Sequence, residues 1–540
     1  MELRLEELGA IVDRAGAAGL AEGDVAKLRA VVDTLALITA ELERKDTSLE
    51  RLRRMCFGAS TERTHDVLGE PSRGNAPAAG GRTDGASAPR RKGHGRNGAD
   101  AYPHAARVKV AHETLEPGDP CPAAGCMKGR VYPQSDPSVL VRVRGMAPLQ
   151  ATVYECARLR CHLCGEVYTA ASPPGVGTEK YDETASSMIG LLKYGTGLPF
   201  HRIAQLEKNV GIPLAVATQW DVVSRAAVRL VPAYTELVRQ AAQGEVLHND
   251  DTGVKILALM GPEARAEVTD DAGEEGRTGL FTSGIVSVSG GHRIALFLTG
   301  RKHAGENLAA VLAQRAAELG APIQMCDGLS RNVPAPFETI LANCLAHARR
   351  KYVDVVDHFP DECRHVLETL GEVYRTDAKA CAQGLSPEER LRLHQAESGP
   401  RMEDLEQWMK AQIEERRVEP NSGLGEAIGY MTKRWDKLTL FLRVAGVPLD
   451  NNVVERSLKK AILHRKNALF YQTENGARVG DLFMSLIHTT ELCGANPFEY
   501  LVALQRNEKA VCADPARWMP WNYTEALAEL SPAASTGPPD

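Results

Sequence analysis

Residues 245–250, Glu245-Val246-Leu247-His248-Asn249-Asp250, form an apolar run that ends in polar side chains, as expected of a buried β-strand. Two more strand-like runs follow, 280–288 and 293–298, joined at Gly290-Gly291. A helical pattern at 306–319 and a short apolar run at 322–326 come next. The order of three strands, a helix and a strand is the order in which a ribonuclease-H-like α/β sheet begins.

Three acidic residues stand at the ends of such elements. Asp250 closes the first strand and Asp327 follows the last, while Glu455 lies in Asp450-Asn451-Asn452-Val453-Val454-Glu455-Arg456, where Asp450 is predicted to cap a helix. Two strand-end Asp residues and one helical Glu can converge on one cleft. Oxygen ligands of this kind hold Mg²⁺ or Mn²⁺, and two such ions about 3.5–4 Å apart promote phosphodiester cleavage. Asp251 ranks second to Asp250, because adjacent strand residues point to opposite faces.

Basic residues gather near these acids in two clusters. Each neutralised DNA phosphate releases counterions, so such clusters favour a nucleic-acid backbone as the ligand. The alternative is a pair of solvated helix faces. The predicted DNA-binding residues are Arg349, Arg350 and Lys351 in the first cluster, and Arg456, Lys459, Lys460, Arg465 and Lys466 in the second.

Two cysteine pairs lie within residues 104–170. Cys121 and Cys126 are separated by four residues, Cys161 and Cys164 by two, and strand-like runs at 139–143 and 151–155 lie between the pairs. Four thiolates at two turns complete a tetrahedron about one structural Zn²⁺, as in a zinc ribbon. Cys156 is a possible substitute ligand, and unligated buried thiols are the alternative.

The first 68 residues read as a helix. Leu28, Leu35, Leu42 and Leu49 recur every seven residues, which predicts a coiled coil that joins subunits into a homo-oligomer. A helix docked on its own chain is the alternative. Residues 71–100 lack large apolar side chains and predict a linker, which ends in the basic run 90–96.

The helical patterns complete a multidomain α+β chain. A helix, a turn at 209–213 and a second helix are compatible with a helix-turn-helix, and residues 343–445 are again helical. The predicted division is a coiled coil at 1–68, a basic linker at 69–103, a zinc-binding domain at 104–170, a helical DNA-binding domain at 171–240, a catalytic domain at 241–503 with an insertion at about 352–445, and a tail at 504–540.

Composition and charge limit how the chain can bind DNA and in which cellular compartment it is expected. The net charge of the 540 residues is −6, so any DNA binding must rest on local basic faces. No apolar run is long enough for a membrane helix and the acidic start does not resemble a signal peptide. Twelve cysteines without such a signal indicate a reducing cytoplasm, where paired cysteines more often bind metal than form disulfides.

Together these segments resemble the insertion sequence 66 family of bacterial DDE transposases. The resemblance extends from the coiled coil to about residue 503 and rests on the cysteine pairs and on the segments 57–62, 198–202, 247–252, 326–328, 345–352, 450–456, 465–470 and 496–501. Residues 329–332 depart from the family, which commonly has an aromatic residue there.

The resemblance implies a ribonuclease-H-like core with a helical insertion and an N-terminal zinc-binding domain. It also implies binding to the terminal inverted repeats of a mobile element, a nucleoid-associated location and possible accessory proteins of the same element. It places Asp250, Asp327 and Glu455 on the catalytic positions. Two other classes stay open: a non-catalytic, domesticated DNA-binding protein, and a metal-dependent hydrolase of small phosphates.

Overall fold

The computed structural model describes residues 114–122, 126, 128–132, 147–160, 162, 167–171, 173–177, 179–261 and 279–530. The predicted coiled coil and basic linker lie outside these residues. In the described part of the chain, no helix is both long and apolar enough to cross a membrane.

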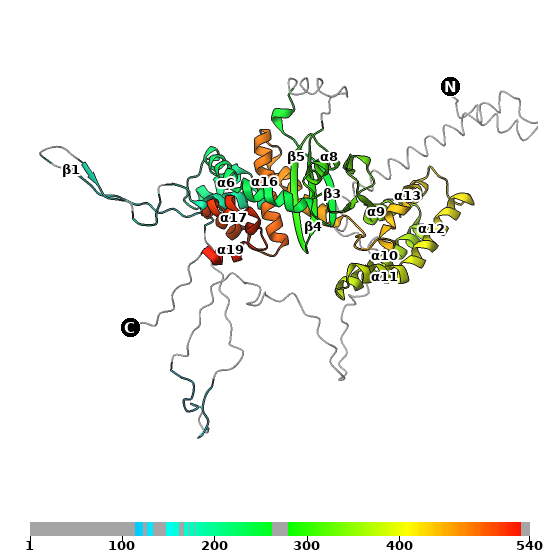
Figure 1. Cartoon of the computed structure of the whole chain (residues 1–540), viewed down its shortest axis with the longest axis horizontal. Coiled ribbons are helices and arrows are strands. Elements are labelled where there is room, and N and C mark those ends of the chain that lie inside the picture. The colour runs from blue at the N-terminus through cyan, green and yellow to red at the C-terminus, as the bar shows by residue number, and fades with distance from the viewer. Residues whose placement is uncertain are drawn as a thin grey trace, which may run out of the picture.

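A mixed five-stranded sheet forms the centre of the fold (Figure 1). Strands β3 (Val246–Gly253), β4 (Phe281–Ser289) and β5 (His292–Gly300) form an antiparallel meander, and helix α8 (Ala304–Leu312) follows. Strands β6 (Ile323–Cys326) and β7 (Ile340–Asn343) then add in parallel, giving the order β5-β4-β3-β6-β7. The predicted order of three strands, a helix and a strand is confirmed. The helix ends at Leu312, and β7 is an additional strand.

Helix α16 (Glu474–Leu492) protects the exposed edge of the sheet. An edge strand offers unpaired backbone groups that favour aggregation. Along β5 these N–H groups donate to three α16 side chains spaced by four residues: Ala295 to Thr489 (3.0 Å), Phe297 to Ser485 (2.9 Å) and Thr299 to Asp481 (2.7 Å). Every fourth residue of α16 thus accepts a hydrogen bond from every second residue of β5.

The sheet shares one hydrophobic core with the helices that precede it. These are α4 (Glu183–Gly190), the π-helical turn Leu191–Gly195, α5 (Phe200–Asn209) and the 27-residue α6 (Val216–Ala242). The predicted helix, turn and helix are present as α5 and α6. One face of α6 packs with β4, β5 and α16 in that core, so the helices predicted as a separate domain are continuous with the sheet.

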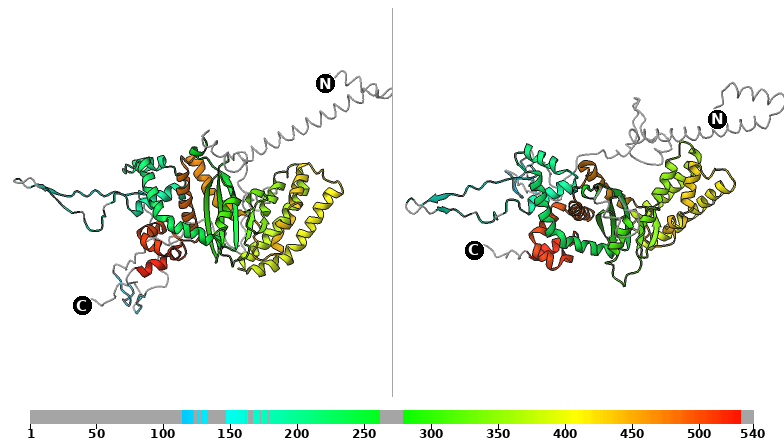
Figure 2. Two further views of the ribbon diagram at one scale, coloured as in Figure 1. Left: turned by 45° about the horizontal axis from the view of Figure 1, so that its top comes forward. Right: turned by 90° about the horizontal axis from the view of Figure 1, so that it is seen from above.

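A second core lies on the β6–β7 side. Its helices form a separate group beside the sheet, coloured yellow-green to yellow in Figure 2. It is built on helices whose presence confirms the predicted helical stretch: α9 (Leu345–Val353), α10 (Pro360–Ala382), α11 (Pro387–Glu397), α12 (Gly399–Glu414), α13 (Gly423–Thr432), α14 (Trp435–Leu438) and the 3₁₀ turn Leu440–Leu442. We call α10 to α14 the helical insertion. A capping box begins α11, where Ser386 and Glu389 exchange hydrogen bonds between side chain and backbone.

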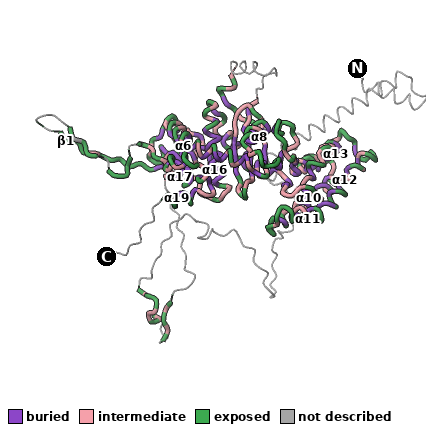
Figure 3. The backbone as a smooth tube through the Cα atoms, viewed as in Figure 1, coloured by how far each residue is buried: buried purple, intermediate pink, exposed green. Residues whose placement is uncertain are grey.

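The segment predicted as a C-terminal tail, 504–540, is helical over much of its described part, which ends at residue 530. Four elements continue the chain there: α17 (Pro497–Arg506), α18 (Glu508–Ala513), the 3₁₀ turn Pro515–Trp518 and α19 (Tyr523–Leu530). Of these, α17 is mostly buried (Figure 3). Val511, Trp518, Met519 and Tyr523 are buried in the first core. Burial of these large apolar groups stabilises the segment.

A short hairpin lies in the predicted zinc-binding region. Its strands, β1 (Arg158–Arg160) and β2 (Val167–Thr169), pair antiparallel and flank the second cysteine pair. The strand predicted at 151–155 is wrong, because these five residues have no regular structure and all are exposed. The alternating run at 151–155 has no second sheet surface to bury its apolar side chains.

Candidate active site

Asp250 lies on the sheet face that α15 (Asn452–Ala468) covers. In the β3–β4 register it pairs with Gly284. A Cβ atom on Gly284 would lie 2.9 Å from the Leu458 side chain and 3.2 Å from that of Val454, both on α15. Glycine therefore lets α15 approach the sheet at the level of Asp250, and Glu455 lies in the first turn of that helix.

Asn451 fixes the start of α15 on β3. It is fully buried; its Nδ2 donates to the backbone oxygen of Asn249 (3.0 Å), and its Oδ1 lies 3.1 Å from His248 Nδ1. The predicted cap is displaced by one residue, because Asn451 occupies the N-cap position. Asp450 still accepts a hydrogen bond from the Asn452 N–H (3.0 Å), so it satisfies one free donor of the first turn.

Asp327 follows β6 and is held by its own loop. Its Oδ1 accepts hydrogen bonds from the Leu329 N–H (3.1 Å) and from Asn332 Nδ2 (2.5 Å). The backbone oxygen of Asn332 in turn accepts from Asn249 Nδ2 (2.9 Å). Buried Asn332 thereby ties the loop of Asp327 to β3. Sequence reasoning missed this role, since no pattern marks a single Asn as a bridge.

The negative charges of Asp327 and Glu455 act on Asp250. Burial, with the negative charges of Asp327, Asp251 and Glu455 adding to it, raises the pKa of Asp250 to about 7, although the Asp251 N–H donates to its carboxylate (2.8 Å). Such a set of oxygen ligands with excess negative charge fits a hard divalent cation, which would offset the repulsion.

Two further potential ligands adjoin Glu455. The ligand atoms of Cys344, His347 and Glu455 lie within 4.8 Å of one another, and His347 Nδ1 is 3.6 Å from Glu455 Oε1. Burial raises the pKa of the Cys344 thiol to about 12, and its Sγ accepts a hydrogen bond from the Asn451 N–H (3.2 Å). A neutral thiol is a poor metal ligand, so the carboxylates are the better candidates.

Asp251 faces the other side of the sheet. Its carboxylate lies 2.9 Å from His303 Nδ1 and 3.3 Å from Arg331 Nη2, and only 2% of the side chain is exposed. The two adjacent acids therefore have different partners, as strand alternation predicts.

The predicted DNA-binding residues differ in their availability. Arg350 and Lys351 are exposed on α9, as are Arg456, Lys459 and Lys466 on α15, while Arg349 is partly buried. Lys460 pairs with Glu491 (2.9 Å). Arg465 donates to Thr252 Oγ1 (3.1 Å) and to the Gly253 carbonyl, which holds α15 to the end of β3.

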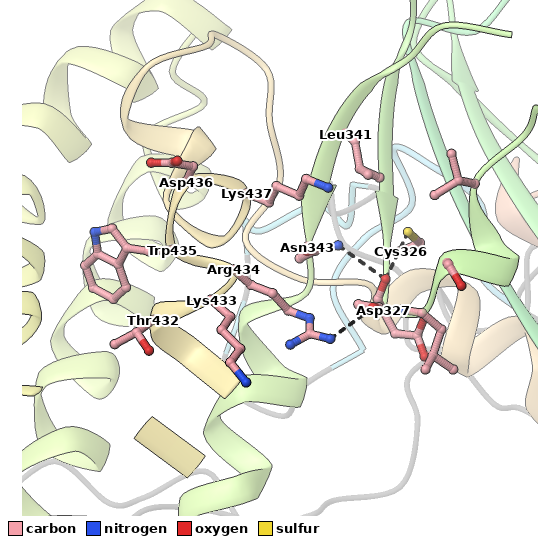
Figure 4. Close-up of a pocket in the computed structure, with 14 residues that line it drawn as sticks. Cys326, Asp327, Leu341, Asn343, Thr432, Lys433, Arg434, Trp435, Asp436 and Lys437 are labelled. Atoms are coloured by element: carbon pink, nitrogen blue, oxygen red, sulfur yellow. Dashed lines mark hydrogen bonds between the residues drawn. The ribbon is translucent and has the colours of Figure 1, made fainter. Parts of the chain in front are cut away.

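A cleft of about 490 Å³ opens beside Asp327, between β6 and the helical insertion (Figure 4). The insertion contributes residues 432–437, among them Lys433, Arg434 and Lys437. Sequence analysis did not select these three residues, because they form no dense basic run and lie more than 100 residues from Asp327.

The first cysteine pair lies at a tight turn. The Cys121 N–H donates to the Gly129 carbonyl (2.8 Å), and a Cβ atom on Gly129 would lie 2.5 Å from Cys126 Sγ and 3.4 Å from Cys121 Cβ. Both cysteines therefore approach the same glycine. Cys161 and Cys164 lie outside the described residues, so the zinc site stays a prediction.

The mixed sheet and its convergent acids define an α/β protein with an acidic site suited to a divalent cation. The family model described as "Transposase IS66 family" matches residues 180–479, more than half of the 540 residues. The chain belongs to the IS66 family of transposases, as the sequence predicted.

Three curated relatives, all from Sinorhizobium fredii (strain NBRC 101917 / NGR234), are uncharacterized proteins. The protein y4jD is 29% identical over 346 residues, covering 62% of this chain and 65% of the relative. The protein y4hP is 27% identical over 358 residues, covering 62% and 61%. The protein y4qI is 26% identical over 357 residues, covering 63% and 62%. Each match spans less than two thirds of the relative.

Proposed function

We propose that this protein is the DDE transposase of an insertion sequence, with a ribonuclease-H-like catalytic core. It binds the terminal inverted repeats of its element, cleaves a DNA strand at each end and transfers that end to target DNA. The observation that carries the proposal is the placement of the three acids: Asp250 lies on β3, Asp327 directly follows the neighbouring strand β6, and Glu455 lies in the first turn of α15, which packs on β3 and β4.

Asp250, Asp327 and Glu455 are the residues that would hold the cofactor, two Mg²⁺ or Mn²⁺ ions. When bound, such ions polarise the phosphoryl group and lower the pKa of a bound water. The fit rests on the oxygen ligands that these carboxylates offer, and their negative charges add to the burial that raises the pKa of Asp250 to about 7.

The reaction consists of two phosphoryl transfers. In the first, water attacks a phosphorus at the element end, the bond to the 3′ oxygen breaks, and a 3′-hydroxyl is left. In the second, that hydroxyl attacks a target phosphodiester, forms a new P–O bond and displaces the 3′ oxygen of the target strand. Such reactions depend mainly on positioning and electrostatics.

The surrounding residues supply that positioning. Asn332 and the Leu329 N–H orient the Asp327 carboxylate, and Asn451 sets the height of Glu455 above the sheet. The exposed cations Arg350, Lys351, Arg456, Lys459 and Lys466, with Arg349, Lys460 and Arg465 beside them, would hold DNA phosphates.

The test is strand cleavage of a labelled duplex carrying the terminal repeat, in Mg²⁺, beside a binding assay on the same DNA. Asp250→Asn, Asp327→Asn and Glu455→Gln should each lower cleavage by at least about 100-fold, and the triple variant should lose little more, because the residues act as one site. DNA affinity should persist. Asp404→Asn, an exposed acid on α12, is the control. Normal cleavage by all three single variants would refute the DDE mechanism, and DNA binding without cleavage by the wild type would favour the domesticated alternative.

Structural zinc forms a separate part of the proposal, held by Cys121, Cys126, Cys161 and Cys164. The convergence of Cys121 and Cys126 on Gly129 supports it. About one zinc per chain is expected, and the Cys161→Ser/Cys164→Ser double variant should lose it, because zinc binding is coupled to folding. Full zinc retention in that variant would assign the metal elsewhere, with Cys156 as the next candidate.

The assembly is proposed to be a homo-oligomer joined by the coiled coil at 1–68, at the nucleoid of the bacterial cytoplasm and with possible accessory proteins of the element. Charged residues in place of Leu35 and Leu42 should lower the mass measured by light scattering. An unchanged mass would favour the helix docked on its own chain.

A further inference from the structure

The geometry points to a second DNA-binding surface, contributed by the helical insertion. We call it the insertion cleft: residues 326–330 on one side and 432–437 on the other. We infer that it binds the phosphodiester backbone of a DNA strand next to the one being cleaved. This inference rests on the proposed function, since it assigns part of the DNA path.

The two walls of the cleft differ in chemistry. One wall is the end of β6 with Asp327, and the other is the turn between α13 and α14. Figure 4 shows Lys437 pointing across the cleft toward Asn343 and Cys326, while Asp436 points away from them. The positive charge of Lys437 also acts on the Cys326 thiol, where it opposes the rise in pKa that burial causes.

Lys433 and Lys437 are available for a ligand. Both are exposed, and within the described parts of the chain neither ammonium group forms an ion pair or hydrogen bond. Other insertion lysines are already neutralised: Lys379 pairs with Glu397 (2.5 Å) and Lys410 with Glu406 (2.7 Å). The unpaired ammonium groups thus lie on the wall that faces Asp327.

Arg434 holds the insertion against the loop of Asp327. Its Nη2 donates to the Gly328 carbonyl (3.3 Å), and its guanidinium lies 4.2 Å from the centre of the Tyr430 ring. A side chain at Gly328 would collide with this guanidinium, so glycine permits the contact. The position of the two lysines relative to Asp327 is therefore fixed by the fold.

The insertion cleft continues the basic surface predicted from the sequence. Lys351 on α9 lies 5.6 Å from the centre of the same Tyr430 ring that Arg434 contacts. The cationic groups of α9 and of the insertion therefore flank one aromatic side chain. A polyanion spanning several phosphates suits such a row of cations better than a small phosphate does, because each additional contact releases a further counterion.

The experiment compares Lys433→Gln/Lys437→Gln with Lys379→Gln/Lys410→Gln, which has the same net charge. The full-length chain is titrated with terminal-repeat duplex and with a single strand of the same sequence, at salt concentrations between about 50 and 200 mM. The cleft variant should lower the slope of log affinity against log salt by about 1.8 for duplex or about 1.4 for a single strand, at about 0.9 or 0.7 per phosphate contact. The control should keep the wild-type slope.

The outcomes separate this inference from the proposed function. A wild-type slope in the cleft variant, with wild-type affinity for both probes, would overturn the insertion cleft as a DNA site even if the protein cleaves DNA. A reduced slope would support it even if the wild type does not cleave. An equal reduction in the control would mean that only net charge matters, and would also overturn the inference. Thermal unfolding should be unchanged, because both lysines are exposed.

Discussion

The side chain of Asn451 donates a 3.0 Å hydrogen bond to the backbone oxygen of Asn249, the residue that precedes Asp250. Two segments about 200 residues apart are joined at this point. Asn451 immediately precedes α15, so the same hydrogen bond fixes the start of the helix that carries Glu455 relative to the strand that carries Asp250. A buried amide whose nitrogen and oxygen both have partners contributes to both stability and geometry.

Replacing Asn451 with Ala should therefore lower both the stability of the fold and the cleavage activity. The loss of its buried hydrogen bonds should lower the free energy of unfolding by about 1–3 kcal/mol. Cleavage should fall by more than DNA affinity does, because Glu455 loses its support while the basic surface remains. Urea unfolding and the cleavage assay measure the two effects. Asn452→Ala removes only a part-buried local bond to Asp450 and is the control; equal losses in the two variants would contradict the role of Asn451.

Gly284 should be equally sensitive to added volume. A methyl group there meets Leu458 at 2.9 Å, so Gly284→Ala should move α15 outward, cost about 1–3 kcal/mol and lower cleavage. Gly300→Ala is the matched control, because that glycine ends β5 with open space around its Cβ position. Adding Leu458→Ala to Gly284→Ala should restore part of the cleavage. Absence of any effect in Gly284→Ala would show that α15 packing does not position Glu455.

Asp251→Asn should be milder than Asp250→Asn. Asp251 contacts His303 and Arg331 on the opposite face, so its substitution should weaken those contacts and lower cleavage by about ten-fold at most, against at least about 100-fold for Asp250→Asn. The same cleavage assay compares the two. A reversed order would assign the metal-binding role to Asp251.

The central strands and the three acids could be predicted because their signals are local. Short apolar runs that lead into Asp250 and Asp327 predict β3 and β6, and Asp327 directly follows β6 as expected. Asp250 was expected at the end of its strand, but β3 continues to Gly253 because these residues also pair with β4. The opposite orientation of Asp251 followed from strand alternation alone. Glu455 was found from its motif, although the register of the helix start was displaced by one residue, at Asn451.

The contacts that hold the site together could not be predicted, because they depend on tertiary packing. In the sequence, nothing distinguishes Asn332 and Asn451 from other polar residues. A glycine such as Gly284 is unfavourable within a strand, and only the packing of α15 against β4 explains why it is there. The four-residue β7 is too short for periodicity to distinguish. Helices α18 and α19 have only six and eight residues, too few for a clear helical period, and Trp518 gains its apolar partners only in the folded core.

A final feature far from the acids concerns pH. Asp481 on α16 is buried, and its carboxyl group contacts the Thr299 N–H (2.7 Å) and hydroxyl (2.6 Å). Burial raises the pKa of Asp481 from 3.8 to about 7, although the Thr299 hydrogen bonds oppose the shift. The folded state therefore keeps this proton to a higher pH than the unfolded state does. Between those two pKa values the folded chain binds more protons, so its stability falls as pH rises.

Asp481→Asn should remove this dependence. The amide is nearly isosteric and cannot ionise, so the variant should be more stable than the wild type at pH 8 and close to it at pH 4. From pH 4 to pH 7 the wild type should lose about 1 kcal/mol per pH unit relative to the variant, and above pH 7 the difference should level off. Urea unfolding across this range, in the absence of divalent cations, measures the effect. Asp404→Asn, at an exposed position, should follow the wild-type profile. If Asp481→Asn follows it as well, the buried carboxyl group is not the source of the pH dependence.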